Sequence, residues 1–131
     1  MSQQNTDFRT PRARAAGLGS AKDGVHHWWN QRVTAIALIP LGILFVFPFV
    51  NALGQPHAEV IEIYQSPWNA IVAVLFLGVT ALHLQQGLQV VIEDYVHSKP
   101  LLTAALLVNI GFCWVLGLVG VFAVLRIALA G

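Results

Sequence analysis

Residues 68–92 read WNAIVAVLFLGVTALHLQQGLQVVI, a stretch of 25 residues that contains no Asp, Glu, Lys or Arg. About 20 predominantly apolar residues are enough for a helix to span the hydrocarbon core of a bilayer. Apolar side chains recur on all sides of this stretch, which excludes an amphipathic helix lying on a surface. The stretch therefore predicts a transmembrane helix.

Two further uncharged apolar segments flank this one, Val33–Val50 before it and Leu101–Leu125 after it. A membrane β-barrel would instead show more numerous alternating segments of ~10 residues. With their flanks counted, we expect transmembrane helices at about residues 28–53, 67–95 and 100–128, after a basic cytoplasmic tail at residues 1–27. The predicted fold class is an all-α integral membrane protein with three transmembrane helices, in a single domain covering residues 1–131.

The segments between the helices are short. Gln55–Ser66 is expected to be a polar loop, and the Glu93–Lys99 connection is shorter still. The second and third helices should therefore be antiparallel neighbours. Pro40 and Pro48 lie inside the first helix and should kink it, as membrane helices tolerate when neighbouring groups satisfy the freed carbonyls.

Composition excludes several classes of protein. The chain is 56% hydrophobic and only 10% charged, whereas soluble domains carry about 25% charged residues. This balance excludes an ordinary soluble enzyme, a nucleic-acid binder and a disordered chain. The single cysteine, Cys113, excludes a disulfide framework and a multi-cysteine metal site.

The distribution of Lys and Arg predicts the orientation, because cytoplasmic segments carry the excess of these residues. The loop after the first helix has none, the loop after the second has Lys99, and Arg126 lies near the C-terminus. The N-terminal segment holds the others, Arg9, Arg12, Arg14, Lys22 and Arg32. We therefore expect a cytoplasmic N-terminus and a periplasmic C-terminus in a bacterial inner membrane, with the mitochondrial inner membrane as the alternative.

His83 is the only strongly ionisable residue inside an apolar segment, and such residues usually mark function because they are costly in a membrane. At 100° per residue, Gly87 lies at about 40° and Asp94 at about 20° from His83 on the same helix. Gly87 would leave clearance for a flat porphyrin, and imidazole is a common axial ligand of haem iron. Spacing alone leaves two alternatives open, a proton relay in a transporter and a structural hydrogen bond between helices.

Polar groups also gather at the expected cytoplasmic ends of the first two helices. Asp94 and Tyr95 could hold a quinone carbonyl, or they could be an ordinary solvated residue and a belt tyrosine. His26, His27 and Arg32 could bind lipid headgroups or the carboxylates of a haem, since Arg pairs with carboxylates through two parallel bonds.

The segment Gly24–Ile36, GVHHWWNQRVTAI, resembles the start of the small hydrophobic membrane anchor of succinate dehydrogenase, of the cytochrome b-binding type. That family carries Gly-Val-His near the first helix, then an Arg six residues after the His and a small-Thr-Ala run. Here these are His26, Arg32 and Val33–Ala35. One departure is His27, which stands where some relatives have an acidic residue.

The second helix carries the other half of the resemblance. The family has a His, a Gly four residues later, and an Asp-Tyr pair eleven and twelve residues later, which here are His83, Gly87, Asp94 and Tyr95. The resemblance is expected to cover about residues 24–125, with the basic tail before Ser20 outside it.

The resemblance implies a non-catalytic anchor subunit of succinate:quinone oxidoreductase, respiratory complex II of the tricarboxylic acid cycle. Its three helices would form half of a heterodimeric bundle with a second three-helix anchor, the cytochrome b subunit. Further expected partners are the iron–sulfur subunit, the flavoprotein subunit and membrane lipid, with no nucleic acid.

The resemblance also implies roles for individual residues. His83 would be an axial ligand of a haem b shared with the partner anchor. Tyr95 and Asp94 would belong to the ubiquinone site, and Arg32 and His26 would contact haem propionates or the quinone pocket. Two rivals remain: a small transporter in which His83 relays protons, and an anchor that has lost its haem.

Overall fold

A computed structural model describes residues 21–129 of the chain, with side chains described from Val25 onward. This range contains four helices and no strand: α2 (Ala21–Ala52), α3 (His57–Gln65), α4 (Pro67–Tyr95) and α5 (Lys99–Leu129). Three of these helices are long and apolar enough to cross a membrane, namely α2 from Val25, α4 and α5. The predicted all-α membrane fold is confirmed.

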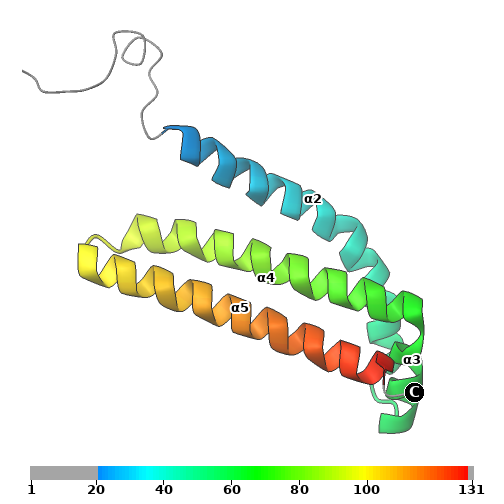
Figure 1. The fold of residues 1–131 in the computed structure, drawn as a ribbon. Helices are drawn as coiled ribbons and strands as arrows, with labels where there is room; N and C mark the ends of the chain where they lie inside the picture. The colour runs from blue at the N-terminus through cyan, green and yellow to red at the C-terminus, as the bar shows by residue number, and fades with distance from the viewer. Residues whose placement is uncertain (1–20, 130–131) are drawn as a thin grey trace, which may run out of the picture.

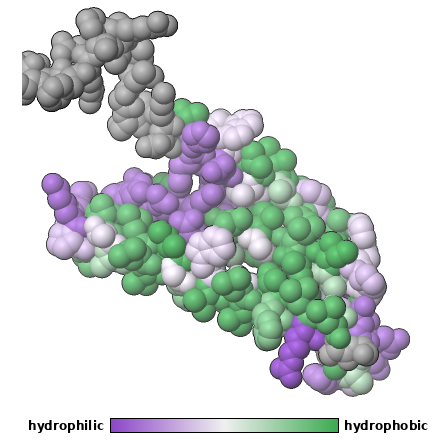
Figure 2. Space-filling model, viewed as in Figure 1, coloured by the Kyte–Doolittle hydropathy of each residue, from purple (hydrophilic) through white to green (hydrophobic). Residues whose placement is uncertain are grey.

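The surface of the molecule is apolar where a soluble protein would be polar. Large hydrophobic side chains stand exposed along all three long helices; Ile39, Phe47, Ile71, Val108 and Phe122 are each more than half exposed. Figure 2 shows a hydrophobic band across the middle of the visible face, with hydrophilic side chains gathered toward the two ends. Lipid or partner helices must cover this band, because exposing so large an apolar surface to water is unfavourable.

The three long helices lie in a row with α4 in the centre (Figure 1). α4 runs antiparallel to α5 on one side and packs against α2 on the other, while α2 and α5 make no contact within residues 21–129. α3 lies across the end where α2 finishes and α4 begins, and it contacts all three long helices. A row of this kind leaves both broad faces of α4 without a complete covering of protein.

α3 corrects the expectation of a polar loop at Gln55–Ser66. The segment is instead a nine-residue helix, His57–Gln65. Val60, Ile61 and Tyr64 form its half-buried face, while Glu59 and Glu62 are exposed. Glu59 lies in the first turn, where a carboxylate interacts favourably with the helix dipole. Burial also raises the pKa of the Tyr64 phenol above 10.0, so this side chain stays neutral.

The start of α2 also differs from expectation, because the helix begins at Ala21 rather than near residue 28. The polar residues before Trp28 show no apolar periodicity, yet a helix satisfies its own backbone groups and continues beyond the apolar core. The rest of the expected tail, residues 1–20, lies outside the described residues. Pro40 and Pro48 lie inside α2 as expected. The chain turns after α2 at Gly54, whose φ of +76° is a left-handed conformation that favours glycine.

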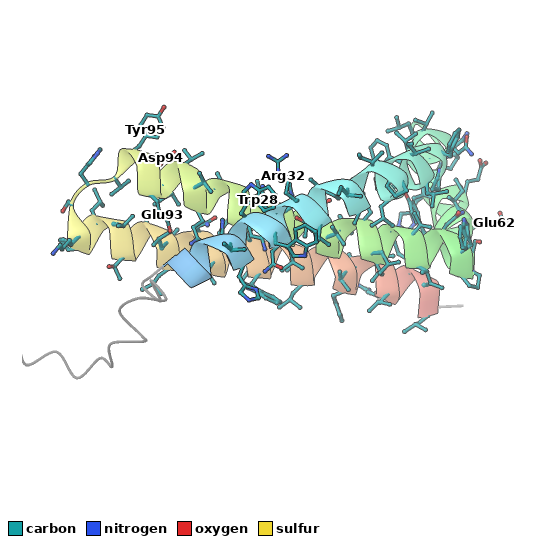
Figure 3. The ribbon with its side chains drawn as sticks, turned by 90° about the horizontal axis from the view of Figure 1, so that it is seen from above. Trp28, Arg32, Glu62, Glu93, Asp94 and Tyr95 are labelled. Carbon is teal, nitrogen blue, oxygen red and sulfur yellow. The ribbon has the colours of Figure 1, made fainter. Side chains whose placement is uncertain are left out.

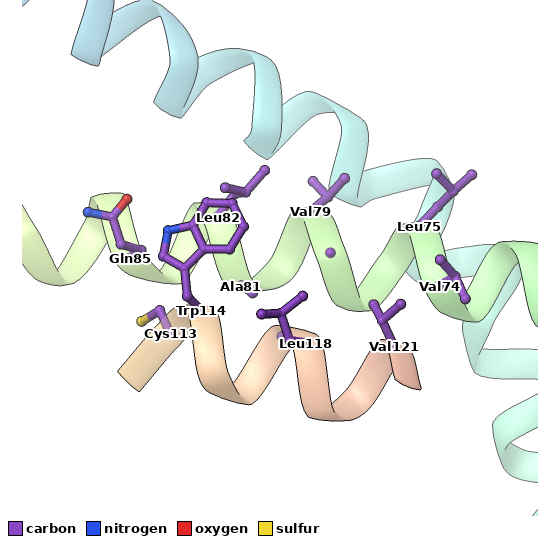
Figure 4. Close-up of a pocket in the computed structure, with 12 residues that line it drawn as sticks. Val74, Leu75, Val79, Ala81, Leu82, Gln85, Cys113, Trp114, Leu118 and Val121 are labelled. Atoms are coloured by element: carbon purple, nitrogen blue, oxygen red, sulfur yellow. The ribbon is translucent and has the colours of Figure 1, made fainter. Parts of the chain in front are cut away.

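α4 and α5 approach closely at small residues. A Cβ added at Gly117 would lie 2.8 Å from the Cβ of Ala81. Next to this contact, the buried Asn109 side chain donates from Nδ2 to the Gln85 carbonyl oxygen at 2.9 Å. Beside it lies an apolar groove of about 310 Å³ between the two helices, lined by residues that include Gly78, Leu82, Trp114 and Leu118 (Figure 4).

Candidate functional site

The side chain of His83 lies on the face of α4 that meets α2. Thr34 Oγ1 lies 2.9 Å from His83 Nδ1, and Gln31 Nε2 lies 3.5 Å from His83 Nε2. Both partners come from α2, and both contacts are partly buried. Among the described residues, the hydrogen-bond partners of His83 therefore belong to the neighbouring transmembrane helix.

The carbonyl oxygens around Thr34 bear on the direction of its hydrogen bond with His83. Thr34 Oγ1 donates to the carbonyl oxygens of Asn30 and Gln31, at 2.9 and 3.1 Å. A hydroxyl has one proton and two lone pairs, so while that proton is directed at a carbonyl oxygen, the same oxygen can accept from His83 Nδ1. Donation from His83 Nδ1 to Thr34 Oγ1 would place the imidazole proton on Nδ1 and leave the lone pair on Nε2. The Gln31 amide at 3.5 Å is a long donor to that lone pair, beyond the usual 2.7–3.2 Å.

Other buried polar atoms between these helices have no partner among the described residues. Relative to Thr34, His27 lies at about 20° and Gln31 at about 60° on the α2 wheel; Thr80 and Gln86 each lie at about 60° from His83 on α4. We call these six residues the α2–α4 seam. Its unpaired buried atoms are His27 Nε2, Gln31 Oε1, Thr80 Oγ1 and Gln86 Oε1. Orphaned buried groups are rare in folded proteins and require an explanation.

These residues fit the haem expected from the sequence. A neutral imidazole with an unprotonated Nε2 is the form that ligates a metal, and the orphaned atoms of the seam are available to a further group. Gly87 has no side chain beside His83, although the Gln31 amide already lies 3.5 Å from the position a Cβ would take. A ligand on Nε2 therefore requires Gln31 to move aside. Within residues 21–129, no three His, Cys, Asp or Glu side chains gather to hold a metal ion.

Arg32 and His26 lie away from the seam. Arg32 is exposed, stands at about 160° from Thr34 on the α2 wheel, and places its guanidinium 5.4 Å from the Trp28 ring centroid. Figure 3 shows Arg32 and Trp28 on the same helix. His26 is also exposed. The structure does not bring these two residues against His83; both are accessible on the exposed surface of α2.

Asp94 and Tyr95 lie at the last turn of α4, as expected from the sequence. Tyr95 is 80% exposed, and Figure 3 shows it at the end of the helix, pointing outward. Its backbone carbonyl accepts a hydrogen bond from His97 Nδ1 at 3.2 Å, which holds the turn after the helix. The eleven residues from His83 to Asp94 correspond to about 16 Å of helix rise, so the pair is separate from the seam.

Sequence reasoning missed two residues of this site, Gln31 and the hydroxyl of Thr34 as partners of His83. A signal was present, because His27, Gln31 and Thr34 have the i, i+4, i+7 spacing of one helix face. That spacing does not reveal which face of α2 turns toward α4, which depends on how the two helices pack.

Three membrane-spanning helices and a polar seam built on one histidine define a multi-pass helical membrane protein with a site between its helices. The sequence matches the succinate dehydrogenase/fumarate reductase transmembrane subunit family over residues 6–122, and the chain belongs to this family. The family expected from the two motifs is thus confirmed. The match corrects the expected limits of the resemblance, since it begins at residue 6 and includes much of the basic tail.

Curated relatives agree with this assignment. The chain is 32% identical over 122 residues to the succinate dehydrogenase hydrophobic membrane anchor subunit of Paracoccus denitrificans, covering 93% of this chain and 94% of the relative. It is 36% identical over 96 residues to the protein of the same name from Rickettsia bellii, covering 72% and 76%. No solved structure matches the chain closely enough to count as similar.

Proposed function

We propose that this chain is the membrane-anchor subunit of a succinate:quinone oxidoreductase, with no catalytic centre for succinate of its own. The family match and the names of the curated relatives support this role. The open row of α2, α4 and α5 is compatible with this role, because its exposed apolar faces can pack against partner helices as well as lipid. The proposed partner of this chain is a second three-helix anchor, and iron–sulfur and flavoprotein subunits would dock on the pair.

The observation that carries the site proposal is the setting of His83, whose Nδ1 lies 2.9 Å from Thr34 Oγ1 and whose Nε2 has only the long Gln31 contact at 3.5 Å. His83 would be the ligand through which this chain holds a haem b, and the partner anchor would supply a further ligand. When bound, the haem supplies one-electron redox chemistry at a potential set by its axial ligands and surroundings. The chain's own residues hold and orient that ligand, and Arg32 and His26 face propionates or the quinone pocket from the exposed side of α2.

The exposed Tyr95 and Asp94 form this chain's part of the ubiquinone site. A phenol donates one hydrogen bond, and Tyr95 points outward to where the iron–sulfur subunit, once docked, can complete the pocket. The Lys and Arg distribution supports a cytoplasmic N-terminus and a periplasmic C-terminus, and the bacterial relatives support a bacterial inner membrane. A reporter that is active only outside the cytoplasm should therefore be active when it is fused after Gly131. Activity only from a fusion near Lys99 would show the opposite orientation.

Purification of the tagged chain from its native membrane in mild detergent tests the anchor role. We expect a flavoprotein, an iron–sulfur subunit and a second hydrophobic subunit to co-purify, with succinate–quinone reductase activity and a b-type band on reduction. Recovery of the chain alone, colourless and as a homo-oligomer, would instead identify a small transporter or channel. An active complex without haem would support the anchor role and contradict the proposed haem binding.

A further inference from the structure

We infer that Thr34 is the positioning residue of His83: its hydroxyl oxygen accepts the Nδ1 proton and so presents the unprotonated Nε2 to haem iron. This inference rests on the proposed role of His83 as a haem ligand. It adds a residue on a different helix, which acts on the haem only through the imidazole.

The carbonyl oxygens around Thr34 favour one direction for the hydrogen bond between Thr34 Oγ1 and His83 Nδ1. Its hydroxyl oxygen lies 2.9 and 3.1 Å from the Asn30 and Gln31 carbonyl oxygens, which can only accept and so attract its single proton. If the hydroxyl donated to His83 instead, its oxygen would face both carbonyls with no proton between them. That arrangement would also move the imidazole proton to Nε2 and block ligation there. These contacts therefore favour the tautomer that can bind a metal through Nε2.

The bond also fixes the orientation of the ring. The Oγ1–Nδ1 distance of 2.9 Å is that of a full hydrogen bond, whereas the Gln31 contact on the other side of the ring is 3.5 Å. Thr34 is therefore the firm attachment of the imidazole to α2, and the Gln31 amide is the weaker contact that ligation displaces. Histidines that ligate metals almost always donate their other ring N–H to a carboxylate, a backbone carbonyl or water, which sets the tautomer and raises ligand basicity; in this inference the Thr34 hydroxyl oxygen takes that place.

Two measurable consequences follow from removing the acceptor. Loss of such a partner commonly weakens metal affinity by about 10- to 100-fold, so haem should be lost more readily. A less basic imidazole also donates less electron density, which weakens the ferric form more than the ferrous form and raises the midpoint potential. A tenfold difference between the two forms corresponds to about 59 mV for a one-electron couple.

The test compares Thr34→Val and Thr34→Ser in the purified complex. Valine keeps the branched shape and removes the oxygen, whereas serine keeps the oxygen. Thr103→Val is the matched control, because Thr103 Oγ1 donates to the Lys99 carbonyl oxygen at 3.1 Å in the same helical manner on an exposed part of α5. Haem content per flavin, the low-spin signature of the oxidised haem and its midpoint potential are measured for each variant.

We expect Thr34→Val to raise the midpoint potential and reduce haem retention, with Thr34→Ser and Thr103→Val close to wild type. Equal potentials and haem contents in Thr34→Val and wild type would overturn the inference, as would failure of Thr34→Ser to restore them. A low-spin haem that survives His83→Leu unchanged would overturn the proposed ligand itself. Haem that is lost in His83→Leu but unaltered in Thr34→Val would overturn only the role of Thr34.

Discussion

Tyr95 is the residue whose position leads most directly to a kinetic prediction. Tyr95→Phe keeps the ring at the membrane edge and removes only the hydroxyl donor. One net hydrogen bond contributes about 0.5–1.5 kcal/mol, so succinate–quinone turnover should fall by about two- to tenfold. The reaction of succinate with an artificial acceptor that takes electrons upstream should be unchanged, as should the haem spectrum.

The chain offers a matched control for this substitution in its other tyrosine. Tyr64 is half-buried on α3, at the opposite end of α4 from Tyr95, and Tyr64→Phe should leave quinone reduction unaltered. Normal quinone reductase activity in an assembled Tyr95→Phe complex would remove Tyr95 from the site.

At the residue scale, the sequence predicted where residues lie along one helix better than it predicted their neighbours on another helix. His83, Asp94 and Tyr95 could be placed because all three lie on one regular helix, where spacing alone gives the geometry. Thr34 and Gln31 could not, because their contacts with His83 depend on the rotation of α2 against α4. The roles assigned to these residues all stay predictions, for His83, Asp94 and Tyr95 as much as for Arg32 and His26.

At the scale of elements, the contact of α4 with α5 depends on Gly117. Gly117→Ala would place a methyl group 2.8 Å from the Ala81 Cβ and force the helices apart. Overpacking of this kind costs typically about 1–3 kcal/mol, so the purified complex should unfold at a lower temperature. Gly111→Ala is the control on the same helix, since nothing lies within 4 Å of a Cβ there. Equal unfolding temperatures for both variants would show that α4 and α5 can separate without cost.

The membrane-spanning helices were easier to predict than α3, because a bilayer requires long apolar segments and a short surface helix does not. The ends of α4, Pro67 and Tyr95, agree with the sequence because apolar residues fill the helix and Pro67 starts it. α3 was missed because a nine-residue amphipathic helix with two carboxylates is hard to distinguish from a polar loop. Its signal was the pair Val60 and Tyr64, one helical turn apart and both half-buried.

At the scale of the whole molecule, the row of three helices explains why one chain provides only part of a site. α4 carries His83 toward α2, while the opposite side of α4 packs on α5 at Ala81 and Gly117. Arg32, Asp94 and Tyr95 are exposed, so further subunits can reach them. In the proposed complex, this chain contributes one imidazole and one phenol to pockets that its partners close.

The reduced-minus-oxidised spectrum of the purified complex carrying His83→Leu tests this account most directly. Leucine keeps an apolar side chain between α2 and α4 but removes the ligand that this chain offers from α4. We predict that the low-spin b-type band disappears, or becomes that of a weakly held high-spin haem, while the subunits remain assembled. His57→Leu, at an exposed position on α3, should keep the wild-type spectrum. An unchanged low-spin band in the His83→Leu complex would contradict the account.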